Sequence, residues 1–158
     1  MTFELTTEDV CKLRRIILEL IDQSEADGCL VCDQAGHMLA AENFDQQDPL
    51  LISALGAGVF AATRELAMLL GENEFSSVLH QGKNRSILIG AATEEILLVV
   101  LFSGDTKGGM VKLYTPTAAA AIRKVFDQAS NRPATTESPE HRFVLQNTDN
   151  LFGSVNVN

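Results

Sequence analysis

Basic side chains are scarce in this sequence. Its 158 residues include 12 Lys and Arg but 21 Asp and Glu, so the formal net charge is −9 at pH 7. A protein that binds nucleic acid through the phosphate backbone needs a basic surface, and this surplus of carboxylates argues against a nucleic-acid partner. Adsorption to anionic lipid is disfavoured for the same reason. A protein partner, a small ligand or a cationic patch on another molecule remains compatible with the charge.

Long hydrophobic runs are missing as well. The longest continuous apolar run, residues 96–102, is much shorter than the roughly 20 residues that span a bilayer. The first residues lack the basic-then-apolar pattern of a secretory signal. We therefore expect a cytoplasmic protein that does not insert into a membrane.

Cysteines are few and odd in number: Cys11, Cys29 and Cys32. Cys29 and Cys32 have the spacing of a redox or zinc motif, but they lie in an apolar segment that is typical of a strand. Positions three apart in a strand face opposite sides, and their Cα atoms are roughly 10 Å apart, which is beyond disulfide reach. Because no second pair of Cys or His completes a tetrahedral site, we expect both cysteines to be buried and no metal to bind.

Recognisable catalytic motifs are also lacking. The three histidines stand outside any nucleophile or metal-binding motif. Residues 104–109 are rich in glycine but lack the G-x-x-x-x-G-K-[ST] order of a phosphate loop, so they form either a plain loop or a helix start that attracts an anion. We expect no enzyme, no catalytic residue and no cofactor.

The composition divides the chain into two parts. Residues 1–128 are rich in periodic apolar positions and are expected to form one domain, whereas residues 129–158 begin with a polar linker and are expected to form a flexible polar tail. Three apolar positions of the tail, Phe143, Leu151 and Phe152, are typical of a peptide that docks on a partner or on its own dimer. A disordered leftover is equally compatible with this composition.

Hydrophobic periodicity predicts three helices and five strands within the domain. For the second helix, Asp48 and Pro49 indicate the start, with Asp48 as the cap, and Gly71 indicates the end. Pro116 falls within the third helix pattern and either kinks this helix or restarts it with Thr115 as the cap. The predicted helices cover residues 6–24, 48–70 and 109–128, and the predicted strands cover residues 29–32, 37–41, 75–81, 85–92 and 95–102.

Two strands and one helix have informative compositions. Residues 96–102 are apolar on both faces and belong in the middle of a sheet, whereas residues 75–81 are half polar and belong at an edge. The second helix contains Gly56 and Gly58, each of which costs about 1 kcal/mol relative to alanine. Small residues at helical spacing permit close approach of another backbone, or tight packing of the helix on its own sheet.

This order of elements resembles the roadblock (dynein light chain) family over about residues 5–128. The resemblance implies an α/β (α+β) sandwich of the roadblock/longin-like type, with a five-stranded antiparallel sheet in the order α-β-β-α-β-β-β-α. It places the second helix on one face and the first and last helices on the other. Pro116 departs from the unbroken last helix of the family. The matching segments are residues 28–40, 54–70, 86–90, 96–102 and 109–114.

The resemblance also implies a homodimer that joins the sheets at the third strand and packs the second helices together. Independently, an edge strand that is half polar can pair with its symmetry mate, which satisfies its free backbone groups. The positions expected in this dimer interface are Phe75, Ser77, Leu79, Ala54 and Gly58.

Among prokaryotic members, the sequence is similar to the MglB type. This resemblance implies that the dimer regulates a Ras-like small GTPase in motility or polarity, as an activator or a scaffold, through the surface of the paired second helices. An arginine finger accelerates hydrolysis about 10³–10⁵-fold, but the resemblance implies remodelling of the GTPase's own loops, so Arg64 is expected to dock the partner at most. The positions expected to bind the partner are Arg64, Glu65, Ala61 and Met68.

Two other classes of function compete with this interpretation. A signalling or cytoskeletal scaffold would bind its partners independently of their nucleotide state. A ligand-sensing domain would need a polar-lined cavity, whereas residues 96–102 offer only aliphatic and aromatic side chains, so it ranks last.

Overall fold

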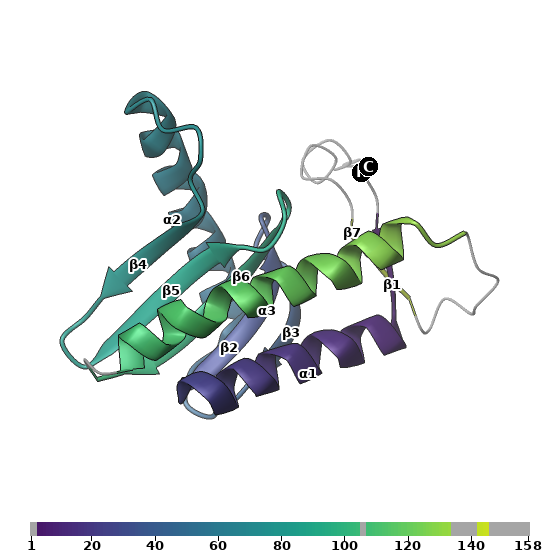
Figure 1. Ribbon diagram of the computed structural model, residues 1–158, viewed down its shortest axis with the longest axis horizontal. Coiled ribbons are helices and arrows are strands. Elements are labelled where there is room, and N and C mark those ends of the chain that lie inside the picture. The colour runs from purple at the N-terminus through teal and green to yellow at the C-terminus, as the bar shows by residue number, and fades with distance from the viewer. Residues whose placement is uncertain (1–2, 105–106, 134–141, 146–158) are drawn as a thin grey trace, which may run out of the picture.

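The computed structural model describes residues 3–104, 107–133 and 142–145. Figure 1 shows one sheet with helices on both sides and a separate small ribbon at the far end. The elements in chain order are β1 (Phe3–Thr6), α1 (Thr7–Ser24), β2 (Gly28–Asp33), β3 (Met38–Glu42), α2 (Pro49–Leu69), β4 (Ser77–Gln81), β5 (Arg85–Ala91), β6 (Ile96–Ser103), α3 (Lys107–Ser130) and β7 (Arg142–Leu145).

The main sheet has five antiparallel strands in the order β3-β2-β6-β5-β4. β6 lies at its centre and is buried on both faces along almost its whole length, as its continuous apolar sequence predicts. β4 lies at one edge and is largely exposed, as its half-polar sequence predicts. The predicted fold class is therefore confirmed.

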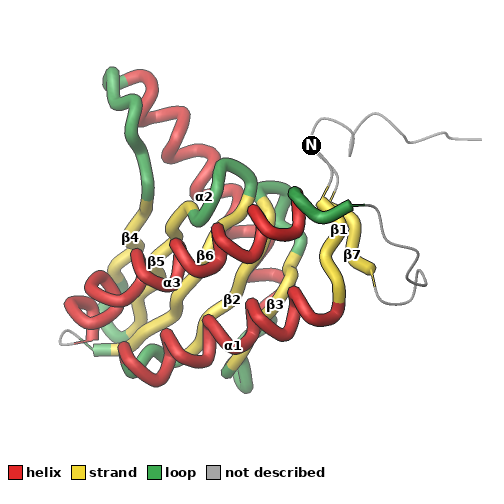
Figure 2. Tube along the Cα trace, turned by 45° about the vertical axis from the view of Figure 1, so that its right-hand side comes forward, coloured by secondary structure: helices red, strands yellow, loops and turns green. Residues whose placement is uncertain are grey.

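Helices cover both faces of this sheet, with α1 and α3 on one side and α2 on the other (Figure 2). Alternate residues of the central strands enter the two cores, so that Val31 packs under α1 and α3 whereas Leu30 packs under α2. Cys29 and Cys32 follow the same alternation and lie in opposite cores as free thiols. The expectation that both are buried is confirmed.

The start of α1 is fixed by a reciprocal cap. Thr6 Oγ1 accepts a hydrogen bond from the Asp9 backbone N–H, and the Asp9 carboxylate accepts one from the Thr6 backbone N–H. Asp9 is only 1% exposed and is also held by Arg132, whose Nη2 lies 2.9 Å from Asp9 Oδ1. This ion pair joins the end of the α3 segment to the start of α1.

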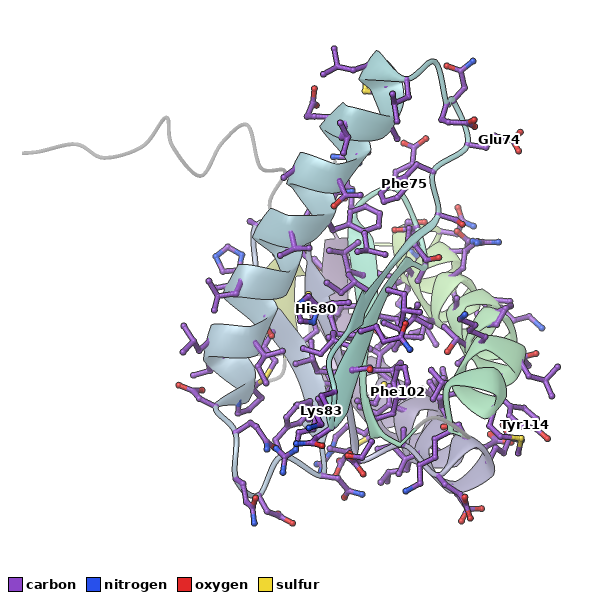
Figure 3. The ribbon with its side chains drawn as sticks, turned by 90° about the vertical axis from the view of Figure 1, so that its left-hand side faces the viewer. Glu74, Phe75, His80, Lys83, Phe102 and Tyr114 are labelled. Carbon is purple, nitrogen blue, oxygen red and sulfur yellow. The ribbon has the colours of Figure 1, made fainter. Side chains whose placement is uncertain are left out.

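α2 begins as its sequence predicts, with Asp48 as the cap and Pro49 as the first helical residue. Its backbone lies against the β2–β3 turn: a Cβ added at Gly36 would stand 2.7 Å from the Cα of Ala54. Gly36 also has a φ of 89°, so glycine is required there for two reasons. The last turns of α2 extend beyond the end of the sheet (Figure 3).

α3 continues through Pro116 as one helix. The alternative of a restart capped by Thr115 is wrong, because Thr115 is inside the helix and its hydroxyl donates to the Val111 carbonyl oxygen at 2.6 Å. Pro116 is exposed, so its ring faces solvent and not the sheet.

A second, two-stranded sheet was not predicted from the sequence. β1 and β7 pair antiparallel, and the Cα partner of Leu5 is Phe143. Leu5 is fully buried in the core formed with α1 and α3. Residues 142–145 of the predicted tail therefore contact the chain's own N-terminal strand through their backbone, whereas Leu151 and Phe152 lie outside the described residues.

Candidate interaction surface

The outer face of α2 is the most apolar exposed surface of the described chain. Leu55 is 62% exposed, Met68 63% and Leu69 85%. Among the exposed positions of this helix, Glu65 is the only charged residue. We call this surface the α2 face, and its exposed members are Leu50, Leu51, Ala54, Leu55, Gly58, Val59, Ala61, Ala62, Glu65, Leu66, Met68 and Leu69.

Length and composition alone also make α2 the one described helix that could span a membrane, although the core helix of a soluble protein passes the same test. A search for continuous apolar runs does not find this helix, because Ser53, Gly56 and Gly58 interrupt the run. The helix as a whole nevertheless stays apolar. The helix packs one side on the sheet through Phe60 and Ala57. Several large apolar side chains of α2 nevertheless remain exposed among the described residues, and such exposed apolar areas mark interaction sites.

The two glycines of α2 have different surroundings. A Cβ added at Gly56 would stand 3.7 Å from the side chains of Ile89 and Val99, so Gly56 packs on the helix's own sheet. A Cβ added at Gly58 would meet nothing within 4 Å. Packing within the chain therefore accounts for Gly56, whereas Gly58 leaves a shallow place on the α2 face where another backbone can approach.

β4 supplies an unpaired strand edge beside this helix. It pairs with β5 on one side, and no described strand pairs with its other side. Ser77 and Leu79 are exposed on it. Phe75 precedes the strand and is half-buried, because its ring packs on Phe60 with the ring centroids 5.1 Å apart. Figure 3 shows Phe75 pointing toward α2, so it supports this helix from the β4 side.

The positions expected to bind a partner differ in their exposure and in their contacts within the chain. Ala61, Glu65 and Met68 are exposed on α2. Arg64 is half-buried: its Nη2 donates to Gln34 Oε1 at 2.7 Å, and its Cζ lies 5.9 Å from the centroid of the Phe60 ring. The guanidinium thus reaches the β2–β3 turn, which contains Gln34.

A broad open cavity of about 720 Å³ adjoins Arg64 at the end of the sheet. Its second cation is Arg123 of α3, whose Nε donates to the Ala92 carbonyl oxygen at 2.8 Å. Gln34 connects Arg64 of α2 to the β5–β6 turn, since its side-chain amide also donates to the Glu94 carbonyl oxygen. Sequence reasoning missed Gln34 and Arg123 because these residues come from segments about 30 or more positions from their partners.

The chemistry of the remaining candidates is limited. Burial raises the pKa of the Cys32 thiol to about 12, with a smaller contribution from the charge of Asp33, and burial also raises the pKa of Cys29 well above its usual value. Both thiols therefore stay protonated and unreactive at neutral pH. Among the described residues, no group of three or more His, Cys, Asp or Glu side chains could hold a metal ion.

The chain is similar in structure to solved MglB proteins. The structure of the gliding protein MglB from Thermus thermophilus is 28% identical, covers 80% of this chain and 97% of that chain, and gives a TM-score of 0.71. Myxococcus xanthus MglB is 27% identical, with coverage of 82% and 96% and a TM-score of 0.73. A protein of Aquifex aeolicus (strain VF5) is 26% identical over 117 residues, which are 72% of each sequence.

The family model described as the Roadblock/LC7 domain matches residues 12–102, a segment that runs from α1 to β6 and includes the α2 face and the β4 edge. The sheet order and the placement of the helices are those that the family resemblance implies. With more than half of its length matched, the chain belongs to the Roadblock/LC7 domain family.

Proposed function

We propose that two copies of this chain associate through their β4 edges and α2 helices, and that the joined α2 faces bind and regulate a Ras-like small GTPase. The observation that carries this proposal is the α2 face itself: an apolar, nearly uncharged helix surface beside an unpaired strand edge. Similarity to MglB proteins at 27–28% identity, one of which is described as a gliding protein, supports a role in motility.

Self-association explains two features of the surface together. Pairing of β4 with its symmetry mate satisfies the free backbone groups of this edge and continues the sheet across the dimer. The same pairing brings two α2 helices side by side, where Gly58 allows their backbones to approach. One solved MglB structure is described as a tetrameric arrangement, so association of this fold with itself has a precedent.

The GTPase partner is expected on the part of the α2 face that the dimer leaves free. Glu65 and Met68 are exposed there, and Ala61 leaves room for an approaching segment. Arg64 already donates to Gln34, so it is suited to shaping this surface and not to reaching a transferred phosphate. The proposed regulator therefore has no active site of its own and acts by holding the GTPase's loops.

A binding and turnover experiment tests the proposal. The full chain is mixed with Ras-like GTPases encoded in the same genome, each loaded with GTP or GDP, and both affinity and the rate of GTP hydrolysis are measured. The expected result is a complex of two copies with the GTPase, preference for the GTP form and faster hydrolysis. Binding that ignores the nucleotide would instead support a scaffold, and no binding would remove the GTPase proposal.

The exposed face supplies the matched variants. Leu55→Glu places a charge on the α2 face, whereas Leu113→Glu places the same charge on α3, where Leu113 is 64% exposed. Light scattering should show one copy for Leu55→Glu and two copies for Leu113→Glu and the unaltered chain. A mass of one copy for the unaltered chain at high concentration would contradict the dimer.

A further inference from the structure

A small cavity lies at the corner of the molecule where the first turn of α3 meets the β4–β5 turn. Its volume is about 140 Å³, and it lies on the α3 side of the sheet, away from the α2 face. Lys83 and Phe102 mark this end of the sheet in Figure 3. The lining residues are Leu79, Gln81, Gly82, Lys83, Asn84, Ser86, Phe102, Gly104, Gly108, Gly109 and Lys112.

The charge of this cavity is the reverse of the charge of the whole chain. Two lysines line it, Lys83 from the β4–β5 turn and Lys112 from α3, and none of the described residues that line it is acidic. The chain as a whole carries a net charge of −9. Among the residues that the structure describes around this cavity, the charge is therefore positive, which favours an anionic occupant.

The backbone N–H groups at the start of α3 are further donors that favour an anion. The first N–H groups of a helix have no partner within the helix and carry its positive dipole end. Gly108 and Gly109 bring the first turn of α3 to the cavity wall. A Cβ added at Gly108 would stand 3.4 Å from Cε2 of Phe102, so glycine lets the helix start close to the sheet.

A buried hydroxyl provides an independent observation. Ser86 on β5 is 9% exposed and lines the cavity, and its hydroxyl has no hydrogen-bond partner among the described residues. Its Cα partners across the strands are Gln81 and Phe102, so all three side chains share the α3 side of the sheet. A buried hydroxyl without a partner is costly, and a bound acceptor at this place would remove the cost.

We propose that this corner cavity binds a small oxyanion of the phosphate class, held by Lys83, Lys112, the Ser86 hydroxyl and the first N–H groups of α3. The volume is below the roughly 300–1,000 Å³ of pockets that hold drug-sized ligands, so it fits a single phosphate group and not a nucleotide. The site uses no residue of the α2 face and stands independently of the proposed GTPase partner.

Nuclear magnetic resonance of the full chain tests this site. The protein labelled with ¹⁵N is titrated with inorganic phosphate while sodium chloride keeps the ionic strength constant. The amide signals of Gly108, Gly109 and Lys83 should shift and saturate. Titration with glycerol phosphate distinguishes two sources of the oxyanion: tighter binding than that of inorganic phosphate assigns a monoester, and weaker binding assigns the free ion.

Matched variants separate the site from general charge effects. Lys112→Ala should weaken binding about tenfold, the size of one charge-assisted hydrogen bond, and Ser86→Ala should also weaken it. Lys124→Ala removes an exposed lysine farther along the same helix and should leave the affinity unchanged. The thermal midpoint of each variant without phosphate confirms that it folds.

Three results would overturn the proposal. These are shifts that fail to saturate, equal weakening by Lys124→Ala and Lys112→Ala, and full affinity in the folded Ser86→Ala variant.

Discussion

A few individual side chains connect α1 to the segment that follows α3. Asp9 caps α1 and pairs with Arg132, which follows α3 by two residues. Burial raises the pKa of Asp9, but the hydrogen bonds from Arg132 and Thr6 outweigh this effect and lower the pKa below its usual value. The charged carboxylate is therefore the form that the folded state prefers.

Asp9→Asn should destabilise the fold by about 1–3 kcal/mol at neutral pH, because it removes the buried negative charge that pairs with Arg132 and weakens the cap. A lowered pKa in the folded state means that this contribution is present above the unfolded pKa of about 3.8 and is lost as the pH falls through the folded pKa. The difference between the two proteins in urea unfolding should therefore shrink as the pH falls below 3.8.

Arg14→Ala is the control for this prediction. Its pair with Glu42 has an Nε–Oε1 distance of 2.6 Å, but the Arg14 side chain is 57% exposed. The expected loss of stability is therefore smaller than that of Asp9→Asn, because water screens an exposed ion pair. An equal loss for Arg14→Ala and Asp9→Asn would show that burial of the Asp9 pair contributes nothing.

Arg64 makes a second prediction at this scale. Because its guanidinium is shared between Gln34 and the Phe60 ring, we expect Arg64→Ala to weaken binding of the proposed GTPase partner less than tenfold and to leave most of the proposed acceleration of GTP hydrolysis. An arginine finger would instead lose about 10³–10⁵-fold in rate. Gln34→Ala should have a similar small effect, since it releases the same guanidinium. Single-turnover hydrolysis measures both variants.

Among the elements, α2 has two apolar sides with different surroundings. Its inner side packs on the sheet, whereas its outer side is apolar and exposed among the described residues. Gly58→Ala improves helix propensity by about 1 kcal/mol, and its added methyl group meets no described atom within 4 Å beyond the neighbouring backbone of the helix. In a chain that stayed monomeric, this variant would therefore be more stable.

In the proposed dimer the outcome should be reversed, because a methyl group at Gly58 separates the two α2 backbones. Gly58→Leu should raise the dimer dissociation constant at least tenfold, and Gly58→Ala should raise it by less. Sedimentation over a range of concentrations measures both. Ala62→Gly is the control, since it removes a methyl group from the same face. Tighter association of Gly58→Leu would contradict close approach of the helices at this position.

The main elements could be predicted from the sequence because their signals are local. The continuous apolar run of β6 indicates a central strand, the half-polar β4 an edge, and Asp48 with Pro49 the start of α2. The small β1–β7 sheet could not be predicted, since four-residue strands carry little periodicity and their partners lie at opposite ends of the chain.

The candidate site shows the same limit. The positions of α2 could be placed on one helix by their spacing, but the roles of Gly56 and Gly58 differ only through the sheet on one side and open space on the other. The contacts of Arg64 with Gln34 and of Arg132 with Asp9 join residues far apart in the sequence. No local pattern contains such pairings.

At the scale of the whole molecule, the segment after α3 makes two separable contributions. Arg132 holds Asp9, and β7 pairs with β1. A chain that ends after Pro133 keeps the ion pair and loses β7, whereas a chain that ends after Asn131 loses both. Thermal unfolding should therefore show a further loss of about 1–3 kcal/mol between the two truncated chains.

The same two chains test whether the tail contributes to partner binding. A tail that docks on a partner predicts weaker binding by both truncated chains than by the full chain. Unchanged affinity and unchanged stability would support a leftover segment without a role. Equal stability of the two truncated chains would contradict a stabilising Arg132 pair.

The pairing of β1 with β7 has a practical consequence for work on living cells. It brings residues 3 and 145 opposite each other, and Figure 1 shows this ribbon at the end of the molecule remote from β4. A fluorescent protein fused before β1 would therefore be anchored far from the strand edge and the exposed helix where recognition is proposed. Imaging with such a fusion should report where the protein goes without blocking what it binds.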